Sequence, residues 1–203
     1  MIVLYSATIC PFAQRTRALL QHLGVDYRLE TVDLDDRDPE FLKQTPTGRV
    51  PLLVDGTRKL YESSVINEYL ADAHGFAEAF ADDPYLRARE RLAMAQWDAV
   101  VLPAFYDSRR DAASFDAARR KTVAAELDEM VKTVFETNRR QGGLLAFHCA
   151  PFWVRMLWLR RDTPLAELIA ERIELRKWLD GAAALPAIQD TLPDPDLVAR
   201  RTS

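Results

Sequence analysis

The order of strand and helix patterns over the first 73 residues limits this chain to a small number of folds. Alternating apolar residues predict strands, and apolar residues three or four positions apart predict helices. The predicted order is strand, helix, strand, short helix, strand, strand and helix, over residues 2–5, 11–23, 27–32, 39–44, 50–54, 60–61 and 63–73. Gly24 ends the first helix, and Asp55–Gly56 supplies a hairpin turn between the last two strands. The segment therefore predicts a βαβ unit followed by a ββα unit.

After this segment the pattern changes, and almost no strand signal remains. Apolar residues at helical spacing predict amphipathic helices over residues 86–101, 123–135 and 165–178. The last two of these helices are expected to end at Gly142–Gly143 and at Gly181. Residues 142–159 predict a further, buried helix rather than a membrane span, because they carry His148 and Arg155 and are fewer than about 20 residues.

This change of pattern predicts two domains. The first, residues 1–75, is expected to be a thioredoxin-like α/β domain, because βαβ followed by ββα is the element order of that fold. Residues 76–84 are a predicted linker, and residues 85–203 a predicted all-helical domain. The expected fold class is therefore α/β followed by all-α.

Cys10 lies where the first strand turns into the first helix, within residues 6–17, which read SATICPFAQRTR. Pro11 suits the first helical position, and the backbone N–H groups of a helix N-terminus favour a thiolate. Arg15 and Arg17 add positive potential nearby. Because the residue three positions after Cys10 is alanine, there is no Cys-x-x-Cys pair, which predicts a mixed disulfide with a small thiol. The alternative is a cysteine that acts only as a small buried apolar residue.

Composition excludes several classes of protein. The chain has 203 residues, 48% of them hydrophobic, and a formal net charge of −4, which is not the pattern of a nucleic-acid-binding protein. Two cysteines predict no disulfide framework, and three histidines without ligand spacing predict no metal site. The first residues lack the features of a secretory signal. We therefore expect a cytoplasmic protein with no membrane or nucleic-acid partner.

Residues 10–17 resemble Cys-Pro-Phe-Ala-(Glu/Gln)-Arg-Thr-Arg, the omega-class motif of the glutathione transferase superfamily. Later segments are similar to this superfamily's Asn-Pro-x-Gly-x-Val-Pro loop, its Glu-Ser-x-x-Ile motif and its late Trp and Pro signature, at residues 45–51, 61–66 and 177–188. Residues 147–153 depart from the family, because they lack the aspartate of its usual capping box. The resemblance implies the glutathione transferase fold and leaves open how the central helix of the second domain begins.

This resemblance also implies a glutathione site. The cysteinyl backbone of glutathione would pair with Val50, as an added strand does, before a cis bond to Pro51. Glu62 would bind the γ-glutamyl ammonium group, and Ser63 with its helix N-terminus would bind the carboxylate. Phe12 is assigned to the same site.

The glycine carboxylate of glutathione requires a cation. Arg37 corresponds in position to a lysine that has this role in omega proteins, and Lys43 and Arg49 are the alternatives.

Cys10 is the catalytic residue that the resemblance implies. Tyr5, Ser6 and Thr8 compete with it, because other branches of the family use a tyrosine or serine near the end of the first strand. With a cysteine, the implied activity is thiol transfer or dehydroascorbate reduction. Glutathione is then the co-substrate, and a small molecule or a protein disulfide is the acceptor. The fold also implies a homodimer.

Two other functions stay open. One is a non-catalytic regulatory adaptor that resembles stringent starvation protein A, and the other is conjugation of glutathione to small electrophiles. An adaptor does not need Cys10 together with Val50–Pro51 and Glu62–Ser63, and this sequence has all of them. His148 and Cys149 do not form a second predicted site, because adjacent residues on a helix do not face each other.

Overall fold

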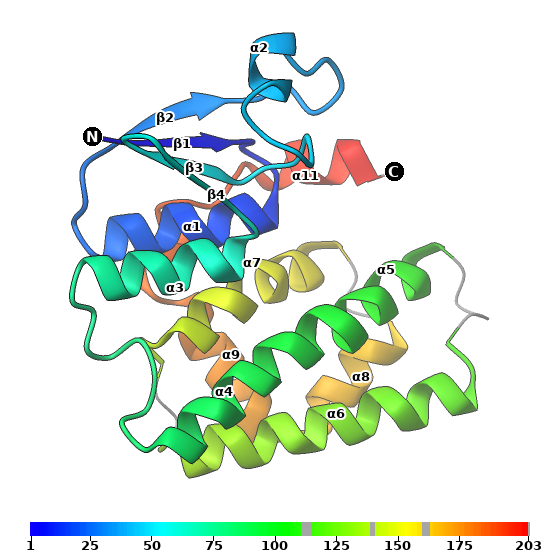
Figure 1. The fold of residues 1–203 in the computed structure, drawn as a ribbon. Helices are drawn as coiled ribbons and strands as arrows, with labels where there is room; N and C mark the ends of the chain where they lie inside the picture. Colours follow the sequence, from blue (N-terminus) through cyan, green and yellow to red (C-terminus); the bar gives the residue numbers. More distant parts are fainter. Residues whose placement is uncertain (111–114, 139–140, 160–162, 203) are drawn as a thin grey trace. The chain divides into compact units, whose positions relative to one another are not determined.

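The computed structural model describes residues 1–110, 115–138, 141–159 and 163–202. The chain divides into two compact units. Met1–Ala79 and Pro186–Ser203 form the N-terminal unit, and Phe80–Leu185 form the helical unit. All four strands of the sheet belong to the N-terminal unit (Figure 1).

The sheet has the strand order β2-β1-β3-β4, with β1 (Ile2–Ser6) and β2 (Tyr27–Thr31) parallel and β3 (Leu52–Asp55) and β4 (Arg58–Tyr61) joined antiparallel. Tyr5 pairs with Leu52, and Leu52 pairs with Tyr61. The end of β1, the start of β3 and the end of β4 therefore meet at one edge of the sheet. The segments that carry the three predicted site motifs begin or end at this edge.

Helices cover the sheet on both sides. The helices α1 (Pro11–His22) and α3 (Ser63–Ala73) pack against each other on one side, and the short α2 (Pro39–Leu42) lies on the other (Figure 1). The buried residues of α1 and α3 include Leu20 and Leu70, both inaccessible to solvent. Gly24 follows α1 with a φ of 62°, a conformation that favours glycine and so ends the helix there. The βαβ and ββα prediction and the thioredoxin-like domain are confirmed.

The last two helices belong to the N-terminal unit. In α10 (Pro186–Gln189) the carbonyl of Ile188 accepts a hydrogen bond of 3.2 Å from Gln14 Nε2 of α1. Beyond it, Asp190 Oδ2 accepts one of 2.8 Å from Gln21 Nε2, and α11 (Pro195–Thr202) follows. This grouping differs from the expected division, which assigned residues 85–203 to one helical domain. The reason is that α1 carries polar side chains matched to a segment more than 160 residues away.

The helical unit is formed by α4 (Pro84–Gln96), the π-helical segment η1 (Trp97–Val101), α5 (Leu102–Arg110), α6 (Ala117–Glu136), α7 (Leu144–Leu159), α8 (Pro164–Ala170) and α9 (Ile173–Ala183). The side chains of Asp83, Asp116 and Thr163 accept hydrogen bonds from the first N–H groups of α4, α6 and α8. The predicted all-helical second domain is confirmed. Its first predicted helix runs without a break through α4, η1 and α5.

Two predicted helix ends in this unit are wrong. The helix α6 ends at Glu136 rather than at Gly142–Gly143, because Asn138 takes a φ of 55°, and asparagine can replace glycine in this left-handed conformation. The helix predicted over residues 165–178 is two helices, α8 and α9. Arg172, with φ −100° and ψ 73°, leaves the helical conformation between them. Helix α9 then continues through Gly181 to Ala183.

The buried helix predicted within residues 142–159 is confirmed as α7, which begins without a side-chain aspartate cap. Its first turn is held by Ala146 N, which donates to the Gly143 carbonyl at 3.0 Å. Pro151 lies inside the helix, and its carbonyl accepts a hydrogen bond of 2.7 Å from Arg155 Nη1. Across the described residues, none of the helices has the length and apolar character needed to cross a bilayer.

Candidate functional site

Cys10 occupies the N-cap position of α1, with an extended backbone at φ −73° and ψ 116°. Its backbone N–H donates to the carbonyl of Ala7 at 3.1 Å, and its own carbonyl accepts from Gln14 N at 3.0 Å. The thiol makes no capping hydrogen bond, is partly exposed and packs against a cluster that includes Val50. The thiol is therefore available for chemistry at a position where helix N–H groups favour negative charge.

Arg17 supports the loop that leads from β1 to Cys10. Its side chain is only 6% exposed, and Nη1 donates to Ser6 Oγ at 2.6 Å and to the Ala7 carbonyl at 3.1 Å. Its Nη2 donates to the carbonyls of Thr8 at 3.1 Å and Thr191 at 3.4 Å. All four partners are neutral oxygen atoms, so the guanidinium brings an unneutralised positive charge beneath the loop.

The charge of Arg17 acts on Cys10. Burial lowers the pKa of Arg17, and negative charge on Cys10 and on Tyr27 opposes that effect. The positive charge of Arg17 therefore lies close enough to Cys10 for the two groups to interact. Arg17 is therefore a positioning and electrostatic residue beneath the loop, in agreement with the positive potential expected from the sequence.

The three competitors of Cys10 are placed differently. Ser6 is buried, and its hydroxyl is engaged by Arg17. The ring of Tyr5 packs against Phe41, with the ring centroids 5.5 Å apart. Thr8 is exposed, and its carbonyl is held by Arg17. Of these side chains, Cys10 combines partial exposure with a place at the helix N-terminus.

A cavity of about 100 Å³ lies at the same edge of the sheet, and it is lined by Phe12, Thr47, Arg49, Val50, Pro51, Tyr61, Glu62 and Ser63. Five of the predicted site residues are brought together here: Phe12, Val50, Pro51, Glu62 and Ser63. The Val50–Pro51 bond is cis, as expected. Cys10 is not among the lining residues, but it lies two residues before Phe12 and packs on the cluster that contains Val50.

Glu62 and Ser63 meet the cavity at the N-terminus of α3. Glu62 has a φ of 69°, which is uncommon outside glycine, and its side chain is exposed. Ser63 is buried, and its hydroxyl oxygen accepts a hydrogen bond of 3.3 Å from Arg15 Nη1. The Arg15 guanidinium also lies 5.1 Å from the centroid of the Phe12 ring. Arg15 thus joins two walls of the cavity.

The three candidate cations lie in different places. Arg49 lines the cavity, whereas Arg37 is exposed on the loop before α2 and is not among the lining residues. Lys43 forms an ion pair with Glu40, with Nζ and Oε1 2.6 Å apart. The structure therefore does not bring the first choice, Arg37, to the cavity, and it favours the alternative, Arg49. Sequence position alone does not distinguish cations on one loop.

Sequence reasoning missed Thr47 and Tyr61 in the cavity wall. A signal for Tyr61 was present, because it ends β4 directly before Glu62. Thr47 precedes Gly48, whose φ of 63° makes a turn that presents the loop to the cavity.

Elsewhere, His148 Nε2 lies 3.0 Å from Asp98 Oδ1, and Cys149 is fully buried in α7. Within the described part of the chain, His, Cys, Asp and Glu side chains form no group of three that could hold a metal ion.

Comparisons with known proteins identify the family. Residues 4–79 match the model of the glutathione S-transferase N-terminal domain. The chain is 34% identical over 193 residues to glutathione S-transferase omega-1 of Sus scrofa, a match that covers 93% of this chain and 79% of that protein. It is 32% identical over 136 residues to the Mus musculus omega-1 protein, covering 66% of this chain but only 53%, about half, of that relative.

The fold is also similar to that of glutathione transferase Omega 2C from Trametes versicolor. The TM-score is 0.80 at 19% sequence identity, and the match covers 99% of this chain and 96% of that one. The fold, the ordered motifs and the match to the Sus scrofa protein agree. The chain belongs to the glutathione transferase family and is similar to its omega-class members.

Proposed function

We propose that this chain is a glutathione-dependent thiol-transfer enzyme that works through a mixed disulfide at Cys10. The observation that carries the proposal is the meeting of a partly exposed N-cap thiol, the buried guanidinium of Arg17 and the cavity beside Val50 at one edge of the sheet. Membership in the glutathione transferase family supports glutathione as the co-substrate.

Glutathione fits the residues that line this edge. The N–H and C=O of Val50 pair with its cysteinyl backbone, which points the glutathione sulfur toward Cys10. The exposed carboxylate of Glu62 binds the γ-glutamyl ammonium, and the N-terminus of α3 at Ser63 binds the γ-glutamyl carboxylate. Arg49 binds the glycine carboxylate in place of Arg37, because Arg49 lines the cavity.

The proposed reaction has two exchange steps. The Cys10 thiolate attacks the glutathione sulfur of a glutathionylated substrate, so that a Cys10–glutathione disulfide forms and the substrate thiolate leaves and takes a proton. The thiolate of a second glutathione then attacks the glutathione sulfur of this mixed disulfide. Glutathione disulfide is released, and the Cys10 thiolate is restored. The net exchange converts the glutathionylated substrate and one reduced glutathione into the free substrate thiol and glutathione disulfide.

The intact mass of the protein after exposure to glutathione disulfide tests the proposal. We expect one glutathionyl adduct in the wild type and in Cys149→Ala, none in Cys10→Ala, and loss of the adduct on addition of reduced glutathione. An adduct that persists in Cys10→Ala would contradict the assignment of the thiol.

Other outcomes would favour the alternative functions. Binding of glutathione without an adduct, together with turnover of an electrophile, would favour conjugation. The absence of both glutathione binding and the adduct would favour the adaptor. The homodimer and the cytoplasmic location stay predictions, as does the identity of the acceptor.

A further inference from the structure

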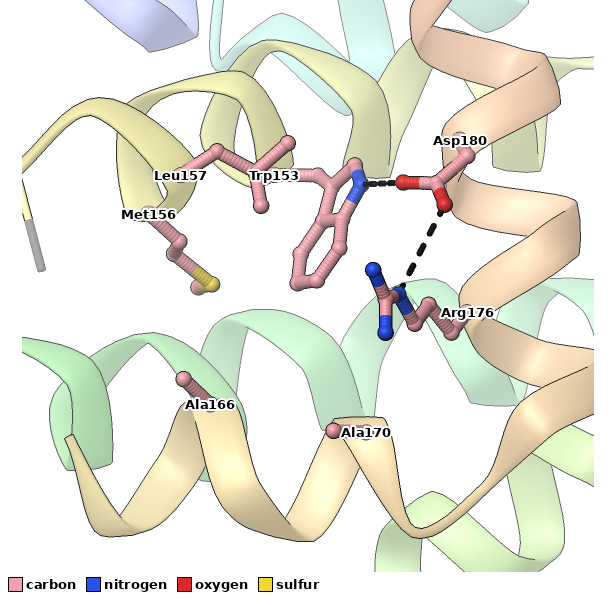
Figure 2. Close-up of a pocket in the computed structure, with 7 residues that line it drawn as sticks. All are labelled: Trp153, Met156, Leu157, Ala166, Ala170, Arg176 and Asp180. Atoms are coloured by element: carbon pink, nitrogen blue, oxygen red, sulfur yellow. Dashed lines mark hydrogen bonds and ion pairs between the residues drawn. The ribbon is translucent and has the colours of Figure 1, made fainter. Parts of the chain in front are cut away.

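A second cavity lies within the helical unit, between α7, α8 and α9 (Figure 2). Its volume is about 290 Å³, and its lining residues are Trp153, Met156, Leu157, Ala166, Ala170, Arg176 and Asp180. None of them belongs to the N-terminal unit or to the site proposed for glutathione. Its volume is near the lower limit of small-molecule pockets, so it suits a ligand of one or two rings.

The walls of this cavity are mainly apolar. Trp153, only 3% exposed, supplies an aromatic surface from α7, and Met156 and Leu157 continue that wall. On the opposite side, Ala166 and Ala170 lie one turn apart on α8. Their small side chains leave the space that larger residues would fill. An aromatic ring and a methionine sulfur both contact planar rings favourably.

One end of the cavity is polar. Asp180 Oδ1 accepts a hydrogen bond of 2.8 Å from Trp153 Nε1, and Asp180 Oδ2 lies 3.7 Å from Arg176 Nε. Both carboxylate oxygens therefore face a donor of the protein, although the side chains of Arg176 and Asp180 are about half exposed, at 55% and 48%. Figure 2 shows the two terminal nitrogens of Arg176 on the side of Trp153, with Nε as the nitrogen that a dashed line joins to Asp180. The group that the cavity presents to a ligand at this end is thus a guanidinium.

We propose that this cavity is a binding site for a small aromatic carboxylate. The ring lies between Trp153 and the alanines of α8, and the carboxylate accepts hydrogen bonds from the terminal nitrogens of Arg176. A cationic ligand is disfavoured, because Asp180 is already engaged by Trp153 and Arg176. The site is independent of Cys10 and of glutathione.

The side-chain N–H signal of Trp153 in a proton–nitrogen NMR spectrum tests the proposal. The chain has four tryptophans, so the signal is assigned by its loss in Trp153→Phe. The titration uses 2-naphthoate, with the neutral 2-naphthamide as control and saturating reduced glutathione throughout. We expect a saturable shift of the Trp153 signal with 2-naphthoate and about tenfold weaker binding of 2-naphthamide.

Two variants test the two ends of the cavity. Arg176→Gln should weaken 2-naphthoate binding to the level of 2-naphthamide, whereas Arg28→Gln should not, although the two arginine side chains are equally exposed, at 55% and 56%. Ala170→Leu should abolish binding of both probes by filling the cavity. Residue 170 is an exposed helical position where leucine is well tolerated, so that this variant should fold.

Several results would overturn the proposal. These are no saturable shift of the Trp153 signal up to millimolar 2-naphthoate, equal binding of the charged and neutral probes, or unchanged binding in Ala170→Leu. A shift confined to other tryptophans would overturn it as well. The glutathione chemistry at Cys10 is tested separately, by the mass of the adduct, so that the two proposals can fail independently.

Discussion

The cavity beside Val50 and the cavity beside Trp153 are built in different ways. The first is shaped by the backbone, through a cis bond at Val50–Pro51 and positive φ angles at Gly48 and Glu62. The second lies between three regular helices, and its shape depends on a large Trp153 facing small alanines. A substitution that disfavours the required backbone angles should disrupt the first cavity, whereas a change in side-chain volume or charge should disrupt the second.

Substitutions of the two cysteines should give the largest difference, which is in the thiol-transfer rate. Cys10→Ser should lower the thiol-transfer rate by roughly a hundredfold or more, because a hydroxyl is a far weaker nucleophile than a thiolate. The matched control, Cys149→Ala in the fully buried part of α7, should keep the rate of the wild type. A steady-state assay with a glutathionylated peptide and reduced glutathione measures both. Comparable loss in the two variants would contradict the assignment of Cys10.

Two arginines provide the next contrast. Arg17→Met should lower the free energy of unfolding by about 2–4 kcal/mol, because the buried Ser6 hydroxyl and Ala7 carbonyl and the partly buried carbonyls of Thr8 and Thr191 lose their donor. Arg176→Met, at a half-exposed ion pair, should change it by less than about 0.5 kcal/mol. Urea denaturation gives both values.

Arg17→Met should also slow alkylation of Cys10 by iodoacetamide at pH 7, because it removes a buried positive charge and the hydrogen bonds that hold the loop before Cys10. Arg17→Lys, which keeps the charge but not the fork of donors, should recover part of that rate. Unchanged alkylation in Arg17→Met would show that its charge does not reach the thiol.

Glu62 tests whether backbone conformation and ligand recognition can be separated. Glu62→Gly should raise the free energy of unfolding by about 1 kcal/mol, because glycine adopts the φ of 69° without strain. It should weaken glutathione binding, because the carboxylate for the ammonium group is lost. Glu62→Gln should weaken binding with no such gain in stability. Calorimetric titration and thermal unfolding distinguish these effects, and wild-type affinity in both variants would rule out the ammonium contact.

The smallest expected effects come from two glycines. Gly48→Ala should lower the free energy of unfolding by about 1 kcal/mol, because Gly48 has a φ of 63° and an added Cβ would lie 3.3 Å from Leu42 Cδ2. Gly181→Ala should raise the free energy of unfolding by up to about 1 kcal/mol, because Gly181 lies inside α9 and alanine is the better helix former. An added Cβ there would overlap the end of the exposed Gln141 side chain, which can rotate away. A lower unfolding temperature for Gly48→Ala and a higher one for Gly181→Ala would support the contrast between the two units.

Much of the N-terminal unit was predictable from the sequence. Its strands and helices follow the expected order, and α3 has the predicted bounds, Ser63–Ala73. The segments around Cys10, Val50 and Glu62 were identified as parts of one site, and the pairing of Tyr5, Leu52 and Tyr61 places them at one edge of the sheet. The choice between Arg37 and Arg49 stays a prediction: of the two, Arg49 lines the cavity, and that depends on how their loop folds.

The helical unit was predictable only in outline. The break at Arg172 was missed, because the side chain that stabilises it reaches another helix: Nε pairs with Asp128 Oδ1 at 2.8 Å, and Nη2 donates to the Ala124 carbonyl at 3.0 Å. The cavity beside Trp153 was missed because its lining is spread over three helices.

The sequence by itself determined the order of the elements, the family, and the position of Cys10 at a helix N-terminus. These follow from apolar periodicity and turn chemistry, which act over a few neighbouring residues. Only the tertiary structure decided that Arg17 lies beneath the loop before Cys10, that α10 packs with α1, and that α7, α8 and α9 leave a cavity. These features depend on side-chain packing and hydrogen bonds between segments that are distant in the chain, which local patterns do not encode.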